Sequence, residues 1–90
     1  MNTIYKFTLE VQDFQNVEMP KDAEIISIQS QGGKPCIWAI VDPKADTNLR
    51  SFMTYGTGHE MKYSLDRLRF VGTYQIYEGE FVGHVFEIIK

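Results

Sequence analysis

The residues of this sequence best suited to chemistry lie in one short segment after an expected strand: Gly56, Thr57, Gly58 and His59. Glycines at such a place let backbone N–H groups converge on an anion, and the Thr57 hydroxyl and the His59 imidazole would add further donors. The segment is predicted to hold one phosphate group. The competing interpretation is a plain glycine turn, since the segment lacks the lysine of a phosphate-binding loop and no clear helix follows it.

Five further side chains are candidates for the rest of a ligand site: Trp38, Arg50, Thr73, Tyr74 and His84. Trp38 and Tyr74 are predicted to offer a flat face to a base, with core packing as the alternative. Arg50 would offer a guanidinium to an anion, or else be a solvated charge. His84 lies on an apolar strand face, where a structural role competes with ligand contact.

Catalysis and metal binding have little support in the sequence. His59 and His84 are the only two histidines, so a metal site would need carboxylates from elsewhere, and neither a metal nor a cofactor is expected. A small hydrolase that uses both histidines is the third interpretation, weakened because Met61 and Phe86, two residues after each, carry no hydroxyl. No Ser-His-Asp order is readable, and no catalytic residue is assigned.

The composition favours small partners over polymers. The chain of 90 residues is expected to form one domain, residues 1–90, with 12 acidic and 9 basic residues and a net charge of −3. Because no basic stripe is present, duplex nucleic acid is not an expected partner, whereas a small anion needs only one or two cations. With 43% hydrophobic residues, the chain has more apolar side chains than the core of so small a domain can enclose. A homo-oligomer is therefore expected, because its interface would bury the remainder.

The single cysteine and the N-terminal residues bear on location. Cys36 lies in an apolar run and is predicted to be a buried small hydrophobe. The first residues do not resemble a signal peptide, and no segment approaches the ~20 apolar residues of a membrane span. The expectation is a cytoplasmic protein without membrane contact.

Alternating hydrophobic residues predict strands along most of the chain. Residues 4–11 and 16–19 are predicted to form a hairpin, and residues 24–30 and 36–41 a second one around Gly32 and Gly33. Residues 36–41 are apolar on both faces, which indicates either a central strand or an edge strand covered by another subunit.

The second half of the chain continues in strands with one weak region. Residues 49–55 run into the glycine segment, and residues 60–68 are either a loop or one helical turn capped by Ser64. Residues 69–77 and 80–89 form the strongest hairpin candidate, with His84 and Phe86 on one face and Glu87 on the other. Six or seven strands predict an all-β antiparallel sandwich or partly open barrel with at most one helical turn.

Several segments together resemble a family of short proteins from bacteriophages and prophages that has no assigned activity. The resemblance covers nearly the whole chain and rests on residues 4–6, 36–43, 56–59, 71–75 and 81–87. In general character such proteins are similar to accessory proteins that counter bacterial immunity. The resemblance implies a phage context and transfers no catalytic residue.

Three functions follow as expectations. The first is an oligomeric sponge that sequesters a small phosphate-containing nucleotide signal without cleaving it, in the cytoplasm of an infected cell. The second is a protein–protein inhibitor or structural accessory module, in which the glycines are only turns. The third is the small histidine-dependent hydrolase.

Overall fold

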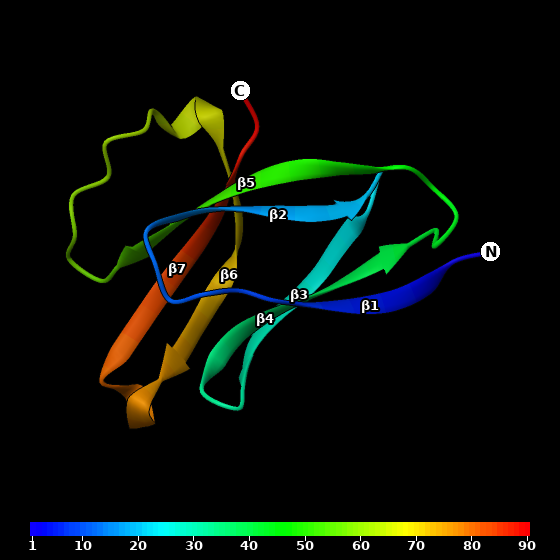
Figure 1. The fold of residues 1–90 in the computed structure, drawn as a ribbon. Coiled ribbons are helices and arrows are strands. Elements are labelled where there is room, and N and C mark those ends of the chain that lie inside the picture. Colours follow the sequence, from blue (N-terminus) through cyan, green and yellow to red (C-terminus); the bar gives the residue numbers. More distant parts are fainter.

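The computed structural model describes all 90 residues, and its seven strands form two antiparallel sheets (Figure 1). One sheet has the order β1-β4-β3 and the other β2-β5-β7-β6. The only helical segments are two 3-10 turns, η1 (Leu65–Arg67) and η2 (Tyr77–Gly79). The predicted all-β class is confirmed, and the strands are β1 (Thr3–Thr8), β2 (Phe14–Pro20), β3 (Glu24–Gln31), β4 (Lys34–Val41), β5 (Thr47–Gly56), β6 (Leu68–Ile76) and β7 (Phe81–Ile88).

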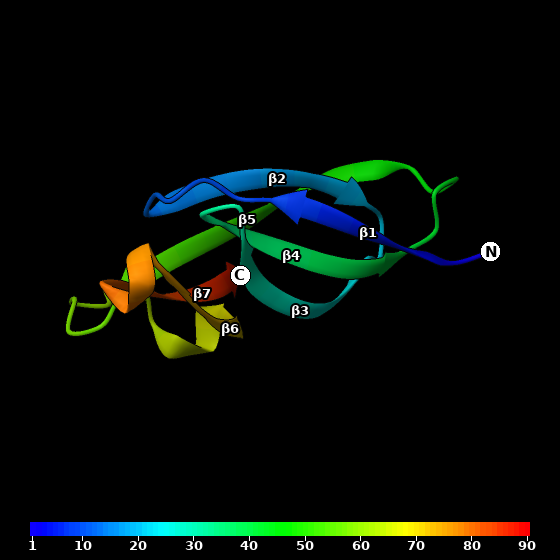
Figure 2. The same cartoon turned by 90° about the horizontal axis from the view of Figure 1, so that it is seen from below.

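The two sheets enclose one core and approach each other along the β3 and β6 edges. In Figure 2, β3 and β6 lie along one side of the molecule and β1 and β2 along the opposite side. The Ile28 side chain of β3 lies against Gly72 of β6, and the Ser30 hydroxyl donates to the Gln75 carbonyl. No backbone ladder joins these two edges, so the sandwich is closed here by side chains. The largest fully buried side chains include Phe52, Leu9, Met19, Ile37, Val41 and Val85.

The predicted hairpin between the first two strands is wrong, because β1 and β2 belong to different sheets. β1 pairs with β4, and β2 pairs with β5. Between them Leu9 is fully buried, and its N–H donates to the Pro35 carbonyl at 2.8 Å. Burial of Leu9 draws the chain into the core just where a hairpin turn would have to begin, so it crosses to the other sheet.

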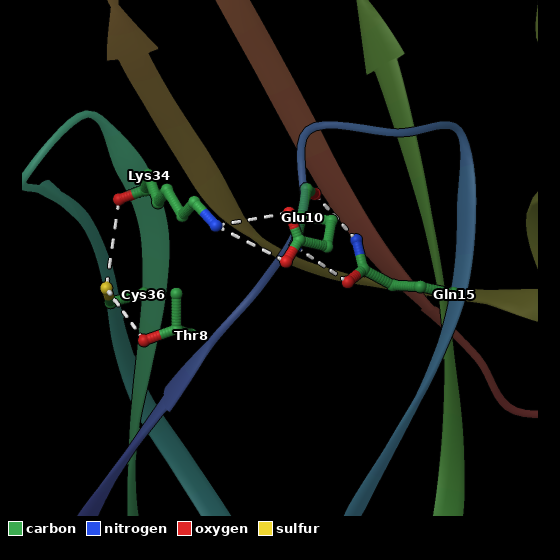
Figure 3. Close-up of polar contacts among 5 residues, drawn as sticks. All are labelled: Thr8, Glu10, Gln15, Lys34 and Cys36. Atoms are coloured by element: carbon green, nitrogen blue, oxygen red, sulfur yellow. Dashed lines mark hydrogen bonds and ion pairs between the residues drawn. The ribbon is translucent and has the colours of Figure 1, made fainter.

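Side-chain contacts hold this crossing in place (Figure 3). The Gln15 amide accepts from the Glu10 N–H and donates to the Glu10 carbonyl, both at 2.9 Å. Lys34 at the start of β4 reaches the Glu10 carboxylate at 3.3 Å. Cys36 is buried as predicted, and its sulfur lies 3.8 Å from the Thr8 hydroxyl.

The other two predicted hairpins are confirmed. Gly32 and Gly33 join β3 to β4 with φ of +61° and +81°. Positive φ at both central residues is typical of a type I′ hairpin turn. Four residues join β6 to β7, two more than predicted, and the first three of them, Tyr77, Glu78 and Gly79, have positive φ. β4 is the central strand of its sheet, which is one of the two positions that its apolar faces predicted.

The weakly patterned region forms a single 3-10 turn. Ser64 precedes η1, but its hydroxyl bonds the Asp66 carboxylate and no backbone N–H of the turn. Neither 3-10 turn, at three residues each, is long enough to cross a lipid bilayer.

Candidate functional site

A histidine held between two threonines is the most organised polar group on the outer face of the β2-β5-β7-β6 sheet. The Nε2 atom of His84 lies 2.7 Å from Thr57 Oγ1, and its Nδ1 atom lies 2.9 Å from Thr73 Oγ1. We call Thr57, Thr73 and His84 the histidine cluster. A neutral imidazole has one donor and one acceptor nitrogen, so one threonine hydroxyl accepts from the ring and the other donates to it.

Three elements position this cluster. His84 lies on β7, and Thr73 is its direct partner on β6. Between Phe70 and Gly72 the register of β6 shifts by one residue, and this bulge places Thr73 instead of Gly72 opposite His84. Thr57 follows the last residue of β5, the strand on the other side of β7.

The glycine segment is a tight turn that also carries a second imidazole. The His59 N–H donates to the Gly56 carbonyl at 3.0 Å, and Gly58 has φ of +87°. The turn therefore uses one of the N–H groups that was predicted to face an anion. The His59 ring lies over Gly56, where an added Cβ would be 2.7 Å from the ring carbon Cε1. Only a residue without Cβ allows this close approach.

Two hollows meet at this turn. The first, of about 250 Å³, is lined by the whole predicted segment 56–59 together with His84 and two phenylalanines, and we call it the histidine hollow. The second, of about 270 Å³, is lined by Asp13, Glu60, Lys62 and Tyr63 among others, and we call it the tyrosine hollow. Tyr55 and His59 line both. The structure thus brings five predicted residues to the histidine hollow, namely Gly56, Thr57, Gly58, His59 and His84, and a sixth, Thr73, contacts His84.

Aromatic rings that sequence analysis did not assign to the site form one wall of the histidine hollow. The Phe70 and Phe86 ring centroids are 5.2 Å apart, and Tyr55 meets Phe86 edge-on at 6.0 Å. Phe86 shares the outer face of β7 with His84, as the alternation in that strand predicted. That shared face was the signal that could have added Phe86 to the site.

The comparisons with known proteins give a family and no activity. A family model described as "Domain of unknown function (DUF7352)" matches residues 1–90. The chain belongs to the DUF7352 family. No curated protein and no solved structure matches it. The function of this DUF7352 domain must therefore be argued from its site.

Trp38 and Tyr74 lie outside the site. Trp38 is on β4 of the other sheet and lines a separate hollow of about 260 Å³ with Ile4 and Ile26. Tyr74 is 2% exposed, and its ring fills the space over Gly83. This corrects the prediction that Tyr74 stacks on a base: the bulge in β6 turns it into the core, and burial raises the pKa of its hydroxyl.

Arg50 is already paired in this DUF7352 domain, which corrects its prediction as an anion ligand. Its guanidinium donates to both carboxylate oxygens of Glu87, at 2.6 and 2.8 Å, and also to the Ala23 carbonyl at 2.5 Å. Arg69 reaches the same carboxylate at 3.2 Å. We call Arg50, Arg69 and Glu87 the ion cluster.

Within the ion cluster, Arg50 and Glu87 are largely removed from water, and the pKa values of both are shifted. The Glu87 side chain is 8% exposed and that of Arg50 16%. Burial alone would raise the pKa of the Glu87 carboxyl, but the hydrogen bonds and charges of Arg50 and Arg69 outweigh burial and lower it. The hydrogen bond to Glu87 raises the pKa of Arg50. Nowhere do three histidine, cysteine or acidic side chains gather as a metal site would require.

Proposed function

We propose that this DUF7352 protein is a binding protein that holds a small phosphate-containing nucleotide at the histidine hollow and releases it unchanged. The observation that carries the proposal is the histidine cluster, in which His84 is fixed by two hydroxyls at the edge of a hollow walled by phenylalanine rings. Such a site combines polar groups of fixed direction with a flat apolar surface, as nucleotide sites do.

Each part of a nucleotide has a matching surface in this hollow. The Thr57 hydroxyl and the His59 imidazole are hydrogen-bond donors for a phosphate oxygen. Phe70, 58% exposed, and its neighbour Phe86 offer ring faces to a base. Binding through hydroxyl, imidazole and ring contacts needs no basic stripe, in keeping with the net charge of −3.

The surroundings of His84 favour retention of the ligand over its cleavage. A histidine that acts as a general base is normally oriented by a carboxylate, which stabilises the imidazolium that forms. Here the orienting atom at Nδ1 is the neutral hydroxyl of Thr73. In the phage context implied by the resemblance of the sequence, a protein that binds a nucleotide signal tightly without altering it would act as a sponge, and a homo-oligomer would multiply its sites.

Native mass spectrometry with a panel of cyclic and ADP-ribose-derived nucleotides tests the proposal. We expect the protein to retain one of them, and heat to release it with unchanged mass. Thr57→Val and His84→Gln should each weaken binding about 10-fold or more, because each removes a polar group of the site. Thr47→Val is the matched control, since Thr47 lies at the far end of β5 and bonds Glu18 at 2.7 Å.

Other outcomes would overturn the proposal. A ligand released with a changed mass would indicate the histidine-dependent hydrolase, for which the 2.7 Å contact between Thr57 Oγ1 and His84 Nε2 is the supporting geometry. Failure to retain any nucleotide of the panel would overturn the proposal that the ligand is a nucleotide.

A protein–protein inhibitor or accessory module is the second candidate, and an apolar row across the outer face of the sheet favours it. Strand pairing aligns Phe14, Met53, Phe86 and Phe70, and Phe14 is 47% exposed. A stable complex with a host protein, lost in Phe14→Ser but kept in Thr57→Val, would support this candidate, because Phe14 lines neither hollow.

A further inference from the structure

The hydroxyl of Tyr55 is buried and has no hydrogen-bond partner. The residue is 8% exposed, and its Oη atom lies out of contact with water. Buried polar groups in folded proteins nearly always have a partner, so each exception needs an explanation. Because Tyr55 lines both hollows, the missing partner can be an atom of a bound ligand.

The tyrosine hollow contains further polar groups with no partner inside the protein. Asp13, Glu60 and Lys62 line it, and none of their side chains forms a hydrogen bond or an ion pair. The hollow thus holds two carboxylate acceptors, one ammonium donor and the Tyr55 hydroxyl. None of the four groups has a hydrogen-bond or ion-pair partner within the protein.

We propose that the tyrosine hollow is a second subsite, which binds the hydroxyls of a sugar attached to the phosphate on the side away from the base, as in ADP-ribose, through Tyr55 Oη and the carboxylates of Asp13 and Glu60. This inference rests on the proposed function and extends it from the histidine hollow to its neighbour. Carboxylates commonly accept hydrogen bonds from ribose hydroxyls in nucleotide sites. A phosphate would be less favourable in this hollow, because two carboxylates oppose the single charge of Lys62.

The two subsites share a wall, so we expect one linked ligand to occupy both. Tyr55 and His59 lie between the hollows, so the phosphate at Thr57 and His59 and the sugar at Tyr55 belong to adjacent parts of one molecule.

Tyr55→Phe, compared with Tyr74→Phe, tests this subsite by isothermal titration with ADP-ribose. Each change deletes one buried hydroxyl that has no partner, so both variants should fold as the native protein does. Tyr74 lines neither hollow, which makes it the matched control. Tyr55→Phe should bind ADP-ribose about 3- to 10-fold more weakly, and Tyr74→Phe should bind it as the native protein does.

Two fragments, followed by NMR of backbone amides, separate this inference from the proposed function. D-ribose should shift the amides of Tyr55, Glu60 and Lys62, whereas inorganic phosphate should shift those of Thr57 and Gly58. Native affinity in Tyr55→Phe, or ribose shifts elsewhere, would overturn the sugar subsite while phosphate shifts still support the proposed function. Absence of both phosphate shifts and ADP-ribose binding would overturn the proposed function, and the sugar subsite with it.

Discussion

The two faces of β7 carry two polar clusters of opposite character. Glu87 points inward and joins Arg50 and Arg69 in the ion cluster, whereas His84, three residues earlier, points outward and joins Thr57 and Thr73. Both clusters draw on β5, β6 and β7 or the turn that follows β5. Their chemistry differs, because the inner one pairs a buried carboxylate with two arginines and the outer one joins an imidazole to two hydroxyls at the surface.

The ion cluster stabilises the fold, whereas the histidine cluster borders the hollow where we propose that a ligand binds. The Arg50 guanidinium also donates to the Ala23 carbonyl in the turn between β2 and β3, so the ion cluster connects both sheets. Both carboxylate oxygens of Glu87 are bonded to arginine N–H groups. The histidine cluster connects β6 and β7 with the turn after β5 and borders the hollow of the proposed ligand.

Glu87→Ala should give the largest loss of stability. It leaves the Arg50 guanidinium in the interior with only the Ala23 carbonyl, and an unpaired buried charge costs about 3 kcal/mol of unfolding free energy. Urea unfolding measures the loss.

Two companion variants sharpen that result. Arg69→Ala should cost less than about 1 kcal/mol, because the Arg69 side chain is 62% exposed. Replacement of the pair by apolar residues, Arg50→Met with Glu87→Leu, should recover most of the lost stability. A loss under 1 kcal/mol in Glu87→Ala would show that the ion cluster does not connect the sheets as described.

Gly83 and Gly56 face each other in the β5–β7 pair. We expect Gly83→Ala to lower stability and Gly56→Ala to lower ligand binding. A Cβ at Gly83 would lie 2.7 Å from the ring of Tyr74, which is buried and cannot move, so we expect a loss of about 2 kcal/mol. A Cβ at Gly56 would meet only the exposed His59 ring, which can swing away. That variant should keep its stability within about 0.5 kcal/mol and bind ADP-ribose more weakly.

Urea unfolding and titration of both variants with ADP-ribose measure these effects. Equal losses of stability would mean that the His59 ring is held as firmly as the Tyr74 ring. The outer face would then contribute to stability as much as the inner face at this end of the sheet, contrary to our expectation.

Local patterns in the sequence predicted what is local in the structure. The Gly32–Gly33 turn, the β6–β7 hairpin and the opposite faces of His84 and Glu87 all follow from turn chemistry and from the alternation of side chains along a strand. The glycine segment lines the histidine hollow, and the close approach of the His59 ring to the backbone requires glycine at position 56.

Contacts between distant parts of the chain escaped prediction. Arg50 and Glu87 are 37 residues apart, and no local signal shows that an arginine at a strand opening faces inward to a carboxylate. The bulge beside Gly72 reverses the faces of β6 from there on, which buries Tyr74 and exposes Thr73 toward His84. The crossing after Leu9 depends on which sheet buries that leucine, and alternation alone cannot decide it.

Acid should weaken the inner cluster, and this is the smallest of the expected effects. The pKa of Glu87 in the folded protein lies below its ordinary value of 4.5, so the folded state binds fewer protons than the unfolded chain. Its contribution to stability is complete above about pH 4.5 and is lost as the pH falls through the lowered pKa. The effect is smaller than in Glu87→Ala because a protonated carboxyl still accepts hydrogen bonds from Arg50. Urea unfolding at steps from pH 6 to pH 3 should show a steeper fall for the native protein than for Glu87→Gln, in which that proton cannot bind, and parallel curves would place the acid-sensitive carboxylates elsewhere.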